Sequence, residues 1–195
     1  MAVGRPRSFD PEEALEKALK VFWQRGYEGA SLPELTEAMG INRPSLYAAF
    51  GYKENLFRLA MQRYMEGKAC HVVEAVQEAT ARQVAEKLLY GGIDLVTAPK
   101  NPHGCFMVQG ALACSDEAEP IRKEVAKNRQ DGETLVRCRL ERAQAEGDLP
   151  PHADPADLAR FLASLSYGLA VQAAGGATRE ELKRVAEVAL KQWPS

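Results

Sequence analysis

The sequence predicts an all-α protein of about nine helices. Apolar residues recur at helical spacing along most of the chain, and no stretch shows the sustained alternation and β-branched enrichment typical of strands. Residues that start helices, such as Asp10-Pro11 and Asp154-Pro155, alternate with glycines and prolines that end them. At 195 residues, the chain is long enough to bury a core in one or two domains without crosslinks.

Three short helices are predicted within residues 1–52, and each begins at a capping residue and ends at a glycine. They span residues 11–26, 32–39 and 43–50, with the caps Asp10, Ser31 and Asn42 and the terminal glycines Gly26, Gly40 and Gly51. Their lengths and short connections predict a three-helix bundle, which forms an N-terminal domain of residues 1–52.

A second domain, residues 53–195, is predicted to contain the other helices. A long helix begins at Lys53, and a short buried one lies in the charge-free stretch that starts at Gly104. The six predicted helices run from Lys53 to about Thr80 and over residues 82–97, 104–114, 120–146, 155–174 and 178–193.

Residues 35–47 have the proportions of a helix-turn-helix unit, with a tight turn at Gly40. In such a unit the second helix presents the side chains at its N-terminal end to the major groove of DNA. Arg43, Pro44 and Ser45 occupy that end. An arginine can form two hydrogen bonds to guanine, a serine can bond several bases, and a proline can contact a thymine methyl group. These three residues are therefore the candidate base readers.

Other residues are suitably placed to bind DNA phosphates. The hydroxyl of Tyr47 and the ammonium of Lys53 can bond phosphate oxygens, and the backbone amides at the start of the second helix form a further anion site. A basic tail precedes the first helix and can follow the DNA backbone. The candidate phosphate-binding residues are Arg5, Arg7, Ser31, Leu32, Tyr47 and Lys53.

Charge totals do not by themselves indicate a nucleic-acid partner. The formal net charge of the chain is -2, and residues 1–60 contain eight Lys and Arg against eight Asp and Glu. DNA binding therefore requires that the positive charges share one face.

A contiguous set of residues in the N-terminal region carries a family resemblance. The set comprises Ala14, Phe22, Gly26-Tyr27, Ser31-Leu32, Leu35, Ala38-Met39-Gly40-Ile41, Leu46-Tyr47, Phe50-Gly51, Lys53-Glu54 and Leu56-Phe57. The block Leu-Tyr-x-x-Phe-Gly-x-Lys-Glu-x-Leu-Phe is its most specific part. Through these residues, Phe9 to Phe57 resembles the DNA-binding domain of TetR-type transcriptional regulators.

The resemblance implies a homodimeric repressor that a small-molecule, metal or electrophile effector releases from its operator DNA. It also implies phosphate contacts from Tyr47 and Lys53 and base contacts from residues 43–45. The chain departs from the family at Ala48-Ala49, where many relatives have bulky aromatic residues or histidine. This difference implies weaker or purely apolar base contacts from that turn.

A dimer interface is expected on the last two helices. The charge-free helical stretch over residues 161–178 is apolar on all sides, so one side would pack on its own core and the other on a two-fold copy. The resemblance implies the same four-helix interface. A wholly internal helix in a monomer is the alternative. The candidate interface residues are Leu158, Leu162, Leu165, Leu169, Leu182, Val185 and Ala189.

The resemblance places a ligand pocket among the central helices, with the helix from Lys53 as the lever that joins pocket to DNA reader. Apolar residues at such positions also serve as ordinary core, which is the alternative for each. No cofactor motif is found, and none is expected. The candidate pocket residues are Tyr90, Ile93, Cys105, Phe106, Gln109, Val136, Leu140, Phe161 and Tyr167.

The cysteines allow a second kind of effector site. Cys105 begins a predicted helix, where a thiolate is favoured, and His103 and Cys114 lie nearby in the sequence. Such a set can bind soft metal ions or react with electrophiles. The spacing matches no compact metal motif, however, and free cysteines are commonly small buried apolar residues. No metal site is therefore assigned, and these three residues remain weak candidates.

Two other classes of protein are alternatives to a DNA-binding regulator. One is an all-helical protein-interaction module that does not touch DNA, and the other is a cysteine-based enzyme. The chain contains no nucleophile-elbow, phosphate-loop, dinucleotide or zinc-protease motif, so we expect no enzymatic activity. The polar N-terminus and the diluted apolar run near residues 161–178 predict neither export nor a membrane partner, and hence a cytoplasmic protein.

Overall fold

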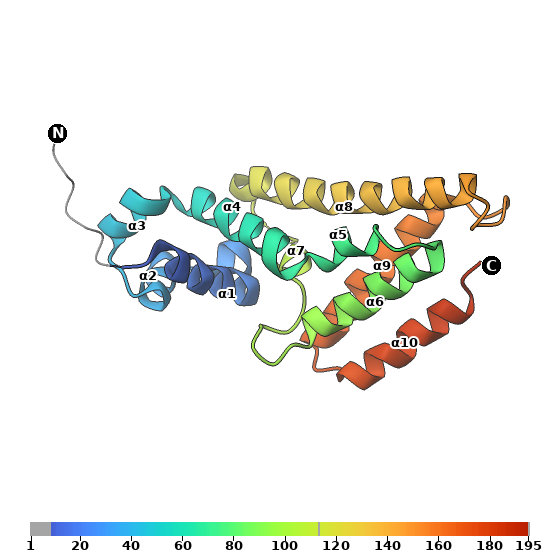
Figure 1. Ribbon diagram of the computed structural model, residues 1–195. Coiled ribbons are helices and arrows are strands. Elements are labelled where there is room, and N and C mark those ends of the chain that lie inside the picture. The colour runs from blue at the N-terminus through green and yellow to red at the C-terminus, as the bar shows by residue number, and fades with distance from the viewer. Residues whose placement is uncertain (1–8, 113, 195) are drawn as a thin grey trace.

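The computed structural model describes residues 9–112 and 114–194. Over these residues the protein consists of helices and connecting turns, with no strand, which confirms the predicted all-α class. Ten α-helices, a π-helix and a 3-10 turn follow one another (Figure 1). The α-helices are α1 (Pro11–Gly29), α2 (Leu32–Met39), α3 (Arg43–Phe50), α4 (Lys53–Arg63), α5 (His71–Ala75), α6 (Ala81–Val96), α7 (Phe106–Gln109), α8 (Glu119–Ala145), α9 (Pro155–Ala174) and α10 (Arg179–Lys191).

The molecule is elongated, with α1, α2 and α3 at one end and the C-terminus at the other (Figure 1). α4 leads from the N-terminal end towards the middle, and α8 runs along one long side of the molecule (Figure 1). α6, α9 and α10 lie side by side in the other half. None of the helices in the described ranges is long and apolar enough to cross a membrane.

The three predicted N-terminal caps form. The side chains of Asp10, Ser31 and Asn42 each accept a hydrogen bond from a backbone N–H in the first turn of α1, α2 and α3, at 2.9, 3.3 and 2.9 Å. α1 extends to Gly29, beyond its predicted end at Gly26. The regular helix is nevertheless interrupted at Gly26, whose φ of 72° and ψ of 176° form a kink.

The helix predicted from Lys53 to about Thr80 is wrong in its length. α4 ends at Arg63 and passes into a π-helix (Tyr64–Lys68), after which α5 forms a separate short helix. The carbonyl of Tyr64 accepts the N–H of Ala69 at 2.9 Å, so one extra residue is accommodated in this turn. The chain then turns towards α6, which Thr80 starts with a capping box.

Two hydrophobic clusters form the core. The first contains residues of the four helices α1, α2, α3 and α4 and parts of α7 and α8. The second contains residues of α5, α6, α8, α9 and α10. α8 contributes to both, with Ile121 and Val125 in the first and Val136 and Leu140 in the second. α7 also borders both clusters, through Phe106 in the first and Val108 in the second. α7 and α8 are therefore packed into both clusters and connect the two halves of the molecule.

Candidate nucleic-acid interface and internal cavity

The turn between α2 and α3 holds α3 at the surface. Gly40 adopts the left-handed conformation with a φ of 71°, which favours glycine and allows the sharp change of direction. Leu46 and Phe50 of α3 are buried in the first cluster, together with Leu35 of α2. The opposite side of α3 is left open to solvent.

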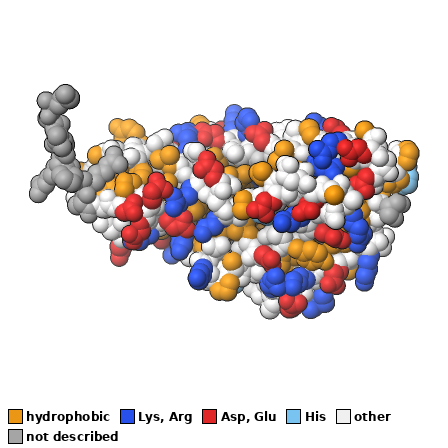
Figure 2. All heavy atoms as spheres, in the orientation of Figure 1, with side chains coloured by type: hydrophobic (Ala, Val, Ile, Leu, Met, Phe, Trp, Pro, Cys, Tyr) orange, Lys and Arg blue, Asp and Glu red, His pale blue; other side chains and the backbone are white. Residues whose placement is uncertain are grey.

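The outward side of α3 carries the predicted base readers. Arg43 and Pro44 are exposed, Ser45 is half-buried, and the ring of Tyr47 is 41% exposed. The backbone N–H of Ser45 donates to the side-chain oxygen of Asn42, the N-cap residue of α3. Figure 2 shows hydrophobic side chains gathered at this end of the molecule, with acidic and basic side chains intermixed elsewhere on the same face.

Lys53 lies beside this surface, at the first residue of α4. Its Nζ sits 4.7 Å from the centre of the Tyr27 ring and 3.5 Å from the carbonyl oxygen of Glu28. Partial burial lowers the pKa of Lys53. The contacts with the ring and the carbonyl fix where its positive charge points.

The remaining predicted phosphate contacts differ in how they are placed. Ser31 is exposed at the start of α2, and Leu32 is partly buried against the first cluster. The Ser31 hydroxyl accepts the N–H of Glu34, as a cap does. Arg5 and Arg7 lie outside the described residues.

Tyr52 is a surface residue that sequence reasoning missed. Its side chain is 75% exposed, and its ring packs against that of Tyr47 with 5.7 Å between centroids. Tyr52 occupies the N-cap position of α4 but makes no capping hydrogen bond there. The signal was present in the sequence, because a tyrosine stands where Ser, Thr, Asp or Asn is preferred. We call Arg43, Pro44, Ser45, Tyr47, Tyr52 and Lys53 the reading face.

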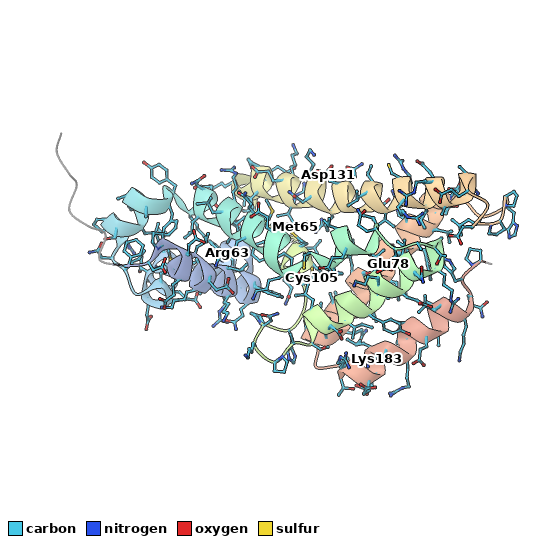
Figure 3. The ribbon with its side chains drawn as sticks, viewed as in Figure 1. Arg63, Met65, Glu78, Cys105, Asp131 and Lys183 are labelled. Carbon is cyan, nitrogen blue, oxygen red and sulfur yellow. The ribbon has the colours of Figure 1, made fainter. Side chains whose placement is uncertain are left out.

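A cavity of about 130 Å³ lies in the middle of the molecule, lined by residues of the π-helix, α5, α6, α7, α8 and α9. In Figure 3, Met65 of the π-helix and Cys105 next to α7 mark this region. The lining is mainly apolar, and small residues such as Ala159 and Ala170 leave room within it. The hydroxyl of Tyr64 lies 3.3 Å from the sulfur of Cys105 at its wall.

Three of the nine predicted pocket residues line this cavity, namely Cys105, Val136 and Tyr167. Ile93, Phe106 and Leu140 are fully buried in the core instead. The other three predicted residues are Tyr90 in a groove between α5 and α6, Gln109 packed against Gly104, and Phe161, which is 44% exposed on α9.

The structure adds lining residues from α8 that sequence reasoning did not single out. Arg129, Gly132 and Glu133 share one helix face with Val136, at the spacing i, i+3, i+4 and i+7. That spacing was readable in the sequence, but a glycine and two charged residues do not suggest an inward face. Arg129 bonds the Met107 carbonyl at 2.8 Å.

Burial affects the ionisable groups around the cavity. It raises the pKa of Tyr64 well above the usual value for tyrosine and that of Tyr167 to about 12, so both remain neutral phenols. Burial lowers the pKa of His71, which lies between the cavity and the outer groove. The cavity wall thus presents neutral hydrogen-bonding groups.

The weak metal candidates His103, Cys105 and Cys114 are not brought together. Among the described residues, no group of three His, Cys, Asp or Glu side chains is arranged to hold a metal ion. His103 is exposed, and α7 has only four residues. The charge-free segment predicted as a helix over residues 104–114 is mostly loop, because it turns to meet α1.

The segment that contains α7 connects the cavity to the N-terminal helices. The Gly110 carbonyl accepts the N–H of Tyr27 at 2.6 Å, and the Gly104 carbonyl accepts the indole N–H of Trp23 at 3.1 Å. Gly26 is needed for this approach, since a Cβ there would lie 3.0 Å from a backbone oxygen of the α7 segment. Tyr27 is also the residue whose ring contacts the ammonium of Lys53.

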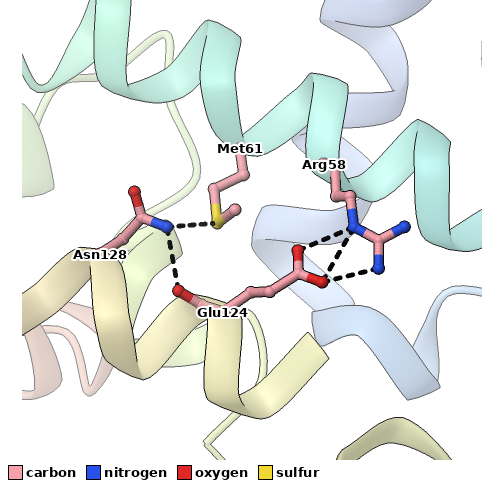
Figure 4. A network of polar contacts seen from close by, with 4 residues as sticks. All are labelled: Arg58, Met61, Glu124 and Asn128. Atoms are coloured by element: carbon pink, nitrogen blue, oxygen red, sulfur yellow. Dashed lines mark hydrogen bonds and ion pairs between the residues drawn. The ribbon is translucent and has the colours of Figure 1, made fainter. Parts of the chain in front are cut away.

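A second connection runs from α4 to α8. The guanidinium of Arg58 forms a bidentate ion pair with Glu124, with contacts from 2.6 to 3.0 Å. One turn further along α8, the amide of Asn128 donates to the Glu124 carbonyl at 2.9 Å and approaches the sulfur of Met61 at 3.9 Å (Figure 4). α4 is thereby fastened to the helix that also lines the cavity.

The predicted interface residues divide into two groups. Leu162, Leu169 and Leu182 are buried in the protomer's own second cluster, whereas Leu158, Leu165 and Ala189 are partly exposed. The apolar residues that α9 and α10 expose are Phe161, Val171, Val185 and Val188. A groove between these helices runs past Leu165, Gly168, Gln172 and Val185.

Comparisons with known proteins cover both halves of the chain. Residues 14–60 match the family model "Bacterial regulatory proteins, tetR family", and residues 86–189 match "Tetracyclin repressor-like, C-terminal domain". The HTH-type transcriptional repressor ComR of Escherichia coli is 36% identical over 193 residues, which span 98% of this chain and 92% of that protein. The repressor BdcR of the same organism is 29% identical over 95% and 90% of the two chains.

Solved structures give the same result. A cysteine mutant of the TetR family transcriptional regulator CifR, complexed with a 26-bp operator DNA, superposes with a TM-score of 0.93 at 43% identity. The match covers 97% of this chain and all of that one. A TetR regulator from Rhodococcus sp. RHA1 gives a TM-score of 0.65 at 40% identity, over 95% and 99% of the two chains.

Proposed function

Because the chain belongs to the TetR family of bacterial regulatory proteins, we propose that it is a homodimeric transcriptional repressor that binds operator DNA and is released by an effector. The observation that carries this function is the outward position of α3, which its buried residues Leu46 and Phe50 anchor. The chain acts by binding DNA, in the cytoplasm where that DNA lies, and not by catalysis. The operator complex of CifR supports the assignment.

Within the reading face, we assign base contacts to Arg43, Pro44 and Ser45 at the leading end of α3. Tyr47 and Lys53 bind phosphates on either side of that helix. Lys53 is suited to this because Tyr27 holds its ammonium in place before DNA arrives. Tyr52 extends the phosphate-binding surface through its exposed hydroxyl. Ser31 and Leu32 supply backbone amides at the start of α2.

The dimer that such a reader needs is built on the exposed apolar residues of α9 and α10. Phe161, Val171, Val185 and Val188 lie on this surface beside Leu165 and the groove. Burying them against a second copy removes apolar side chains from water. The two-fold axis then sets the separation of the two α3 helices, which matches one turn of DNA, roughly 34 Å.

The effector is proposed to bind in the cavity of about 130 Å³ between the π-helix and α9. A molecule there contacts α7 and α8, which are joined to the reading half by the Gly110–Tyr27 hydrogen bond and the Arg58–Glu124 pair. The effector releases DNA when it binds better to a conformation with a different separation of the reading faces. α4 is the lever in this scheme, with the α7 segment as a second link.

The proposal is tested by selecting duplexes from random-sequence DNA with the full chain and measuring affinity against salt concentration. Lys53→Ala is expected to weaken binding to all duplexes alike and to lower the salt slope by about one, because one phosphate contact is lost. Arg43→Ala is expected to relax preference at one base pair, at a cost of about 1–3 kcal/mol for the best sequence.

Lys191→Ala, at the opposite end of the molecule, serves as the control and should leave both the slope and the selected sequence unchanged. No binding to any duplex at low salt would remove the proposed function and favour the protein-interaction alternative. Selectivity that Arg43→Ala leaves intact would remove Arg43 as a reader.

A further inference from the structure

We propose that the cavity takes a compact and mainly apolar molecule of about benzene size, with one hydrogen-bonding group and no positive charge, and that Gly132 sets the size limit. This inference rests on the proposed function in that it takes the cavity as the effector site. It goes further by naming the chemical class of the effector and the residue that selects it.

The size follows from the volume of the cavity. An apolar cavity of roughly 150 Å³ in a protein interior is large enough to bind benzene. The cavity here measures about 130 Å³, so it fits a body of about six to eight non-hydrogen atoms. A bulky drug or a long fatty chain is larger than this volume.

The exclusion of cations follows from the state of the acidic residue in the wall. Glu133 pairs with Arg160 at 2.8 Å, so its charge is already engaged. Arg129 bonds the neutral Met107 carbonyl at 2.8 Å and adds a positive charge to the wall, and the rest of the lining is mainly apolar. A cation in the cavity would therefore lose its hydration without gaining a free counter-ion.

The single hydrogen-bonding group follows from the end of the cavity at Tyr64, Cys105 and Tyr167. Tyr64 already shares a contact of 3.3 Å with the Cys105 sulfur. Both phenols stay protonated at neutral pH and can donate to an oxygen on the ligand. A hydroxyl, ether or carbonyl oxygen is the group that fits them.

Gly132 lies in the middle of α8 and lines the cavity. A glycine inside a helix lowers stability relative to alanine, so such a position needs a reason. Close packing is not the reason here, because no heavy atom lies within 4 Å of where a Cβ would stand. Gly91 on α6 is different, since a Cβ there would meet the Cβ of His71 at 2.9 Å. The missing side chain of Gly132 therefore leaves space for the ligand.

The test uses three probes: benzyl alcohol, the cation benzylamine, which has the same ring, and the larger bicyclic 2-naphthalenemethanol. Each is added to the full chain, and the melting temperature and the binding heat are measured. Benzyl alcohol is expected to raise the melting temperature and to bind, whereas benzylamine and the bicyclic alcohol produce no shift. Equal or tighter binding of benzylamine would overturn the assigned class, as would no binding of benzyl alcohol.

Three substitutions on α8 separate size selection from stability. Gly132→Leu fills the cavity and is expected to weaken benzyl alcohol binding at least tenfold. Asp131→Leu adds the same side chain one residue away on an exposed position of α8 and is expected to leave binding unchanged (Figure 3). Gly132→Ala covers the case in which Gly132→Leu does not fold, and is expected to melt at a higher temperature and to bind less tightly. Binding that neither Gly132 variant weakens would overturn the role of Gly132.

Operator binding is measured on the same proteins, so that failure of this inference can be distinguished from failure of the proposed function. Failure of the wild-type chain to bind any DNA, with benzyl alcohol still bound, would overturn the repressor and leave the class of ligand in place. Selective DNA binding without benzyl alcohol binding would do the reverse.

Discussion

Tyr52 stands where helix stability and the proposed DNA binding favour different side chains. An N-cap side chain normally accepts a hydrogen bond from the first turn of its helix, but the phenol of Tyr52 makes no such bond. The side chain is instead 75% exposed beside Tyr47 and next to Lys53. The first turn of α4 therefore lacks a side-chain cap at the point where the reading face needs a hydroxyl.

We expect Tyr52→Ser to change stability and DNA affinity in opposite directions. The serine can cap α4 and should raise the free energy of unfolding by about 1 kcal/mol, as measured by urea denaturation. Loss of the phenol should weaken operator binding roughly three- to tenfold, the value of one hydrogen bond. Tyr52→Phe, which removes only the hydroxyl, should weaken binding without the gain in stability. Unchanged operator affinity in both variants would show that Tyr52 does not contact DNA.

Individual residues were predictable where local chemistry decides their role. The caps Asp10, Ser31 and Asn42 were found because a short polar side chain before an apolar helix has one main use. Pocket residues were harder to find, because a lining side chain and a core side chain are both apolar and both face inward. Ile93 and Val136 look alike in the sequence, yet only Val136 reaches the cavity.

At the scale of elements, the largest error concerns the helix from Lys53. Apolar residues continue at helical spacing through Leu56, Ala60 and Tyr64, and this periodicity predicted one long helix. The π-helix at Tyr64–Lys68 adds a residue to one turn and shifts the register of everything after it. Periodicity within one element does not reveal this, because Tyr64, the first residue of the π-helix, packs against Trp23 and Phe106, which lie far away in the sequence.

α5 adds a pH-sensitive contact through His71. Burial lowers the pKa of His71 below 6.5, its ordinary value, so the unfolded chain binds the proton more readily. Stability from this residue is therefore fully present above pH 6.5 and decreases as pH falls towards the folded pKa. Glu74 and Lys87 lie nearby and act on the same pKa in opposite directions.

We expect His71→Leu to lose less thermal stability than the wild-type chain between about pH 7.5 and about pH 5, because leucine does not titrate. The comparison uses melting temperatures at equal salt, and the carboxylates common to both proteins cancel in the difference. His71→Gln provides a polar control with the same loss of titration. Parallel melting curves across this range for all three proteins would mean that His71 does not contribute to the pH dependence.

At the scale of the molecule, the first half was predictable in more detail than the second. The block from Leu46 to Phe57 identifies a reader whose geometry is shared by a whole family, so the sequence alone supplied α2, α3 and their turn. The second half offers no such block. Its helices were found from caps and breakers, but the cavity depends on how the π-helix, α6, α8 and α9 pack together. The division between residues 52 and 53 stays a prediction, because α4 packs on both α1 and α8.

The two proposed properties of the molecule, a reading face on α3 and a dimer surface on α9 and α10, must act together. The most direct measurement is therefore the mass of the complex that the full chain forms on a selected duplex, by native mass spectrometry or light scattering. We expect protomers to bind in pairs, with operator affinity lost when Val185 and Val188 are both changed to lysine. A single protomer on each duplex, or binding that survives the loss of pairing, would contradict a dimeric reader of DNA.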